Sequence, residues 1–134
     1  MEPMPTEAEL DILQILWESG PRTVREVHEA LHGKKTGYTT VLKQMQLMVE
    51  KGLLERNERF RSHVYEARQP REQTQGRLLQ RLMQTAFSGS AKSLVLGALS
   101  AKPVSQDELA EIREFLEGFE EKTGNDEAEE ERSL

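Results

Sequence analysis

A short polar stretch between Gly37 and Gly52 holds the side chains best suited to chemistry in this chain. In a helix, the first turns of this stretch would present hydroxyl, ammonium and amide groups toward one side. Such groups hydrogen-bond to the edges of DNA bases in the major groove. No carboxylate, which phosphates would repel, occurs before Glu50. The pattern predicts a helix that contacts bases through Thr39, Thr40, Lys43 and Gln44.

A basic segment follows this stretch directly. Residues 53–56 and 63–66 are candidates for two short strands, and residues 57–62 would connect them as a hairpin. Guanidinium groups bind phosphate through two parallel hydrogen bonds, so arginines here would hold the DNA backbone. Because three glutamates lie nearby, ion pairing on the protein surface is the alternative explanation. The arginines expected to contact phosphates are Arg56, Arg59 and Arg61.

Three residues just before the reading helix, or at its start, could also meet the DNA backbone. Lys34 and Lys35 form a basic turn that is expected to assist backbone binding. Tyr38 has two interpretations of equal weight. Its ring could anchor the entrance of the helix, or its hydroxyl could bond to a phosphate.

The elements that must position these residues have clear local signals. The pairs Thr6–Glu9 and Thr23–Glu26 have the spacing of capping boxes, which start two helices. A third helix is expected over about residues 39–51 and would end at Gly52 in a left-handed conformation. Helix, helix, polar helix and hairpin is the order of a winged helix-turn-helix. The predicted fold is therefore mainly α with a small β-hairpin, in which a winged helix-turn-helix domain is followed by a helical dimerisation region.

Charge is distributed unevenly along the chain. The net charge is −6, which by itself argues against a nucleic-acid partner. Residues 22–68, however, hold ten Lys and Arg against six acids, whereas residues 102–134 hold four against twelve. Since the local field governs the encounter with DNA, the basic segment coincides with the region expected to touch phosphates.

The character of the sequence changes at Pro70, after which three helices are expected. The segment 91–101 is apolar around most of its circumference and is predicted to be buried. Three short helices cannot cover such faces alone, so a symmetric homodimer is expected. The predicted domains are residues 1–69, residues 70–122 and an acidic disordered tail over residues 123–134. The residues expected at the dimer interface are Leu82, Leu94, Leu109, Ile112, Leu116 and Phe119.

Several function classes receive no support. The absence of cysteine excludes disulfides, thiol catalysis and thiolate metal sites. The three histidines do not form a convincing ligand set, so no metal and no cofactor are expected. No catalytic motif is present, so the protein is not expected to be an enzyme. No apolar run could span a membrane and no signal peptide is recognised, which predicts a soluble, cytoplasmic protein.

Several motifs together resemble the penicillinase-repressor family (the BlaI/MecI/CopY type) of small bacterial winged-helix regulators. The order and spacing of the motifs, more than any one of them, carry this resemblance over about residues 5–120. The motifs are Thr6–Leu10, Ile15–Trp17, Thr23–Val27, Tyr38–Val41, Glu50–Leu53, Val64–Tyr65, Phe87–Ser90 and Leu94–Val95.

The resemblance implies a homodimer that binds a palindromic double-stranded DNA operator and represses transcription. In one branch of the family a sensor-linked protease cuts the C-terminal region, and the corresponding bond here would lie near Gly97–Ala98, without the Asn-Phe character of the best-known junctions. A second branch senses copper through C-terminal cysteines, which this chain lacks. Leu47 stands where many relatives carry Arg, so an apolar contact to a thymine methyl could replace a polar one.

Two other functions compete with this interpretation. A winged-helix module could bind a protein partner without sequence-specific DNA binding. An enzyme is the weaker rival, because no site chemistry supports it. The operator sequence, the regulated genes and the inducing signal do not follow from the sequence.

Overall fold

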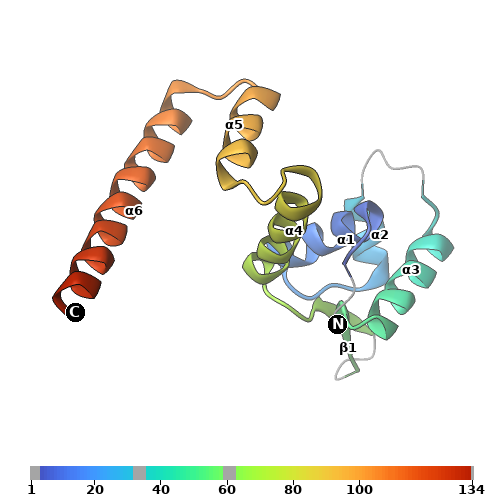
Figure 1. Ribbon diagram of the computed structural model, residues 1–134. Coiled ribbons are helices and arrows are strands. Elements are labelled where there is room, and N and C mark those ends of the chain that lie inside the picture. Colours follow the sequence, from blue (N-terminus) through green and yellow to red (C-terminus); the bar gives the residue numbers. More distant parts are fainter. Residues whose placement is uncertain (1–3, 32–35, 59–62, 134) are drawn as a thin grey trace. The chain divides into compact units, whose positions relative to one another are not determined.

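The computed structural model describes residues 4–31, 36–58 and 63–133 of the chain. The element order is α1 (Glu7–Ser19), α2 (Val24–Ala30), α3 (Tyr38–Glu50), β1 (Leu54–Asn57), β2 (Val64–Ala67), α4 (Arg71–Ala86), α5 (Ala91–Ala101) and α6 (Gln106–Ser133). These elements form two compact units, Met1–Leu82 and Met83–Leu134. Figure 1 labels the helices and β1 along the chain. The predicted class, mainly α with a small antiparallel hairpin, is confirmed.

Both capping boxes form at the expected positions. The Thr6 hydroxyl accepts from the Glu9 N–H at 3.2 Å, and Glu9 Oε1 accepts from the Thr6 N–H at 2.8 Å. Thr23 and Glu26 make the same reciprocal pair at 3.2 and 3.0 Å. These bonds satisfy backbone donors that a helix start leaves without partners, and so they fix where α1 and α2 begin.

The third helix ends as predicted, although it begins one residue earlier than expected. Gly52 has φ +82°, and the Leu53 N–H donates to the Met48 carbonyl at 2.9 Å, which closes the end of α3. The chain then enters β1, which pairs antiparallel with β2 so that Arg56 lies opposite Tyr65. Glycine is favoured at such a turn because it has no Cβ to clash in the left-handed region.

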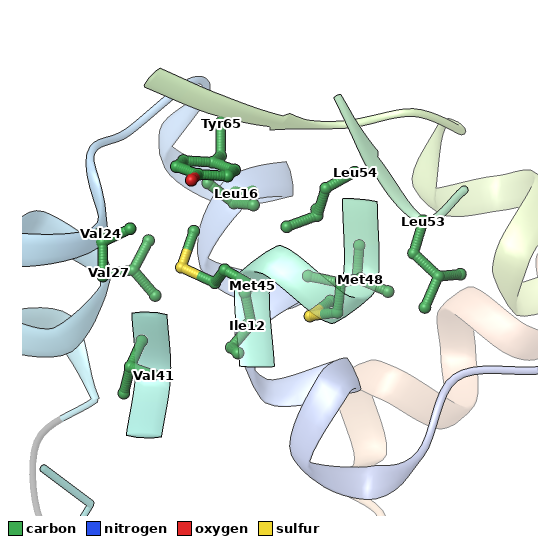
Figure 2. Close-up of a cluster of buried hydrophobic side chains, with 11 residues drawn as sticks. Ile12, Leu16, Val24, Val27, Val41, Met45, Met48, Leu53, Leu54 and Tyr65 are labelled. Atoms are coloured by element: carbon green, nitrogen blue, oxygen red, sulfur yellow. The ribbon is translucent and has the colours of Figure 1, made fainter. Parts of the chain in front are cut away.

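The core of the N-terminal unit unites α1, α2, α3 and the hairpin. Figure 2 shows Met45 and Met48 of α3 beside Ile12 and Leu16 of α1, with the Tyr65 ring of β2 closing the cluster. The buried apolar residues are Ile12, Leu13, Leu16, Val24, Val27, Val41, Met45, Met48, Leu53, Leu54 and Tyr65. Apolar burial on this scale fixes the orientation of α3 and leaves its opposite side in solvent.

The first part of α4 belongs to the N-terminal unit. Trp17 Nε1 donates to the Gln69 carbonyl at 3.0 Å, Thr74 is buried, and the Arg71 guanidinium lies 6.0 Å from the centre of the Trp17 indole. The boundary between the two units therefore falls between Leu82 and Met83, within α4, whereas the composition of the sequence changes already at Pro70.

The burial of one C-terminal segment differs from the expectation. The segment 91–101 was expected to be buried, but α5 has no buried residue within one chain, and its apolar side chains are at most half-buried. Helix α6 runs to Ser133 and so extends over most of residues 123–134, for which a disordered tail is predicted. Residues 127–132 are all Glu, Ala or Arg, which have high helix propensity, and no proline follows Pro103, which favours continuation of the helix.

Candidate nucleic-acid interface

Helix α3 has one side buried in the core and a largely polar side exposed to solvent. Val41, Met45 and Met48 are each 0% exposed and form the inner edge of this helix. Thr39, Thr40 and Lys43 are exposed on the other side, as the sequence predicted. Because the inner edge is locked in the core, the outer side chains are carried on a rigid element.

Gln44 lies in a different place from the other three predicted reading residues. It is half-buried and lines a hollow of about 290 Å³ together with Glu7 and Asp11 of α1. Gln44 follows Val41 by three residues and precedes Met48 by four, so helical geometry places it at the edge of the buried stripe. The structure therefore does not place Gln44 among the exposed side chains of α3.

Gln46 belongs to the exposed side of α3, although the sequence did not single it out. This residue is exposed and follows Lys43 by three positions, which places the two on the same side of α3. Leu47 is also exposed, with 45% of its surface accessible. The spacing relative to Lys43 was the signal that could have identified Gln46. We name the exposed surface made by Thr39, Thr40, Lys43, Gln46 and Leu47 the outer face of α3.

The hairpin formed by β1 and β2, here called the wing, contains one arginine among the described residues, and this arginine is paired. Arg56 Nη2 lies 2.6 Å from Glu58 Oε1, so in the free protein this guanidinium forms an exposed ion pair. Exposed pairs of this kind contribute at most about 1 kcal/mol, so a phosphate could replace the carboxylate at small cost. Arg59, Arg61, Lys34 and Lys35 lie outside the described residues.

The entrance of α3 is held by an aromatic contact. His28 Nε2 lies 2.9 Å from the Thr36 carbonyl, and the Tyr38 ring meets the His28 ring edge-on, with 6.1 Å between centroids and an interplanar angle of 86°. Tyr38 nevertheless remains 44% exposed. The ring therefore anchors the helix entrance, and the exposure of the residue leaves the second interpretation open as well.

A buried carboxylate ties the far end of α3 to α1. Glu9 is 3% exposed, and its Oε2 lies 2.9 Å from Lys51 Nζ. Burial alone would raise the pKa of Glu9, but the hydrogen bond from the Thr6 N–H and the Lys51 ammonium outweigh it and hold the pKa below its usual value. The ionised carboxylate thus links the start of the first helix to the residue that follows the third.

The C-terminal unit exposes apolar side chains on both α5 and α6. Leu109, Leu116 and Phe119 of α6 are 37%, 48% and 59% exposed, and Phe115, which was not among the residues expected at the interface, is 72% exposed. Leu94 and Ile112 are half-buried, and Leu82 at the end of the N-terminal unit is 45% exposed. Apolar surface concentrated in this way is typical of an interface.

Two absences concern only the described parts of the chain. No helix within residues 4–31, 36–58 and 63–133 is long and apolar enough to cross a membrane. The same residues contain no cluster of three or more His, Cys, Asp or Glu that could hold a metal ion.

Three helices packed around one core, followed by a two-stranded antiparallel hairpin, form a winged-helix domain. With an exposed polar side on the third helix, this arrangement defines a winged-helix DNA-binding protein. The chain belongs to the penicillinase repressor family, whose model matches residues 5–118. It is also 30% identical over 122 residues to the transcriptional regulator BlaI of Mycobacterium tuberculosis, in strains CDC 1551 / Oshkosh and ATCC 25618 / H37Rv. This similarity covers 89% of the chain and 87% of each relative. The protein is accordingly a transcription regulator of the penicillinase-repressor type.

Proposed function

We propose that the protein is a homodimeric repressor that binds a palindromic operator. The outer face of α3 would enter the major groove, and Arg56, Arg59 and Arg61 would hold the flanking backbone. The observation that carries this proposal is the exposed outer face, with Lys43 at its centre and no carboxylate before Glu50. Membership of a repressor family supports the same conclusion.

Dimerisation is part of the proposal because one chain leaves apolar surface uncovered. Val95 and Leu96 of α5 and the α6 residues Leu109, Leu116 and Phe119 are all exposed. A second copy would cover these residues and would present two outer faces to successive half-sites of the operator. The palindromic symmetry of the operator would then follow from the two-fold symmetry of the dimer.

Release by proteolysis of the C-terminal region is the finer step that the family resemblance suggests. The candidate bond Gly97–Ala98 lies inside α5, and Gly97 is half-buried. Helical backbone must open before a protease can extend it into an active site. The proposal therefore requires α5 to unfold locally before it is cut.

The test is selection of bound fragments from the source genome, followed by Lys43→Ala. We expect the wild-type protein to select a palindrome. Lys43→Ala should lose about 1–3 kcal/mol of discrimination at one base position of each half-site, because a base contact is removed. Lys92→Ala on α5, an exposed lysine in the C-terminal unit, is the matched control and should select the same palindrome.

A protein-interaction module is the competing function, and it predicts a different result. Such a module would select no palindrome. It would bind DNA weakly, and Lys43→Ala would not change the sequence preference of that binding. If that is observed, the assignment of the outer face of α3 to base reading is wrong.

A further inference from the structure

A second hollow lies beside the entrance of α3, and the proposed function does not use it. It is lined by the start of α2 with its cap, by α3, and by β2 with the residue just before that strand. Its volume is about 500 Å³. The residues around it are Thr23, Val24, Arg25, Tyr38, Leu42, His63 and Tyr65.

We propose that this hollow binds one phosphate of the DNA backbone, gripped by the Arg25 guanidinium, the Tyr38 hydroxyl and the His63 imidazole. The inference rests on the proposed function and extends it, since neither Arg25 nor His63 was predicted from the sequence to contact DNA. A guanidinium, a phenol and an imidazole can all donate hydrogen bonds to phosphate oxygens. None of the described residues that line the hollow is acidic.

Arg25 differs from Arg22, which precedes it in the chain, in its ion pairing. Arg22 Nε lies 3.8 Å from Glu26 Oε2, and Glu26 also accepts from the Thr23 N–H at 3.0 Å. Arg25 is exposed and takes part in none of the ion pairs found within the described residues. A phosphate that binds Arg25 therefore displaces no carboxylate of these ion pairs. A phosphate that binds Arg56 would have to displace Glu58.

The Tyr38 ring and the backbone near His63 are each held by contacts within the protein. The Tyr38 ring is braced by the edge-on contact with His28, and His28 in turn bonds to Thr36. His63 precedes Tyr65 by two residues, and the Tyr65 backbone exchanges hydrogen bonds of 2.8 and 3.0 Å with the backbone of Arg22.

The Arg22–Tyr65 bridge preorganises the backbone around the hollow. It joins β2 to the segment just before α2, so the backbone segments that carry His63 and Arg25 are held near each other without help from DNA. Preorganisation lowers the entropy cost of binding, because the donors need not be gathered at that moment. A phosphate held at the entrance of α3 would set the register of the outer face on the bases, since backbone contacts position and base contacts specify.

The experiment measures operator affinity against salt concentration for wild-type protein, Arg25→Gln and the matched control Arg22→Gln. The slope of log K against log salt should become shallower by about 0.9 for each phosphate that is no longer bound. Arg25→Gln should lose one such phosphate contact in each subunit. The preferred sequence should stay the same. Arg22→Gln should keep the wild-type slope, because Arg22 is not among the residues that line the hollow. Thermal unfolding verifies that both variants are folded.

Tyr38→Phe and ethylation interference complete the test. Tyr38→Phe keeps the ring contact with His28 and removes only the hydroxyl, so weaker binding would assign the loss to that atom. Ethylation of one phosphate per half-site should inhibit the wild-type protein and have no effect on Arg25→Gln.

Three outcomes would overturn the inference. An unchanged salt slope in Arg25→Gln means that no phosphate is held there, and a changed sequence preference means that Arg25 reads bases. Binding of inorganic phosphate to the hollow, with operator affinity unaffected by Arg25→Gln, would assign it to a free anion. If the wild-type protein itself selects no operator, the proposed function fails instead, and the two failures are thereby distinguished.

Discussion

At the scale of single residues, Glu9 connects two elements that are far apart in sequence. One carboxylate oxygen completes the capping box at the start of α1, and the other accepts from Lys51 immediately after α3. A buried carboxylate is costly unless both oxygens find partners, and here both do. The same residue therefore stabilises a helix start and fixes the end of the helix expected to read DNA.

The depressed pKa of Glu9 predicts how stability depends on pH. The ionised form is favoured in the folded state, so the stabilisation is fully present above the unfolded pKa of about 4.5 and is lost as pH falls through the lower folded pKa. Glu9→Gln should lower the free energy of unfolding by about 1 kcal/mol at neutral pH, through loss of the charged hydrogen bonds. The difference from wild type should shrink as the solution is acidified.

Urea unfolding of wild type and Glu9→Gln at a series of pH values from neutral to acid measures this effect. Lys51→Met should show the same trend, because it removes the partner charge and leaves the carboxylate buried. Parallel curves for wild type and Glu9→Gln throughout the acid range would contradict the assignment.

At the scale of elements, Gly52 decides where α3 ends and where the wing begins. Its φ of +82° is rarely adopted by other residues, and a Cβ at this position would lie 3.3 Å from Arg68 Nη1. The turn directs the chain from the last turn of α3 into β1, so the placement of the wing beside the outer face depends on it.

Gly52→Ala should destabilise the protein by about 1 kcal/mol, because alanine is strained in the left-handed region. Gly76→Ala is the matched control within the same unit. Gly76 lies in α4, and a methyl group added there would meet no atom within 4 Å, so alanine should be neutral or should stabilise by up to about 1 kcal/mol. Chemical denaturation compares the two, and equal stability of Gly52→Ala and wild type would refute the argument.

At the scale of the whole molecule, operator binding is expected to depend on two copies of the chain. The exposed side chains Leu109, Leu116 and Phe119 recur along α6 at a spacing typical of a seam between helices. Phe115 stacks on Phe119 with 6.4 Å between ring centroids and enlarges this apolar surface. A covered seam of this kind would supply the fixed distance between two outer faces.

Leu116→Asp should shift the protein toward monomer and weaken operator binding, because a carboxylate would be desolvated in the seam. Ala110→Asp is the matched control, since Ala110 is exposed on α6 and helical spacing places it away from the seam. Sedimentation equilibrium and operator titration measure both effects. A dimeric, tightly binding Leu116→Asp would show that the seam lies elsewhere.

Local sequence determined where several helices of this protein begin or end. The two capping boxes and the stop at Gly52 are decided within one or two turns of chain, so each could be predicted from its own neighbourhood. The order of the three helices and the hairpin follows from these local signals, and that order identifies the winged-helix class. Thr39, Thr40 and Lys43 were expected on the exposed side of α3 because helical spacing sets them away from Val41 and Met45.

Tertiary structure alone decided which side chains share a surface. Gln44 lies at the flank against α1, and Gln46 takes the exposed position, because the core fixes the rotation of α3 about its axis. Arg25 and His63 line one hollow because residues 22 and 65 pair through their backbones. The Glu9–Lys51 pair likewise joins positions 42 residues apart. Contacts at such separations arise from packing of the whole unit, and no periodicity within one segment encodes them.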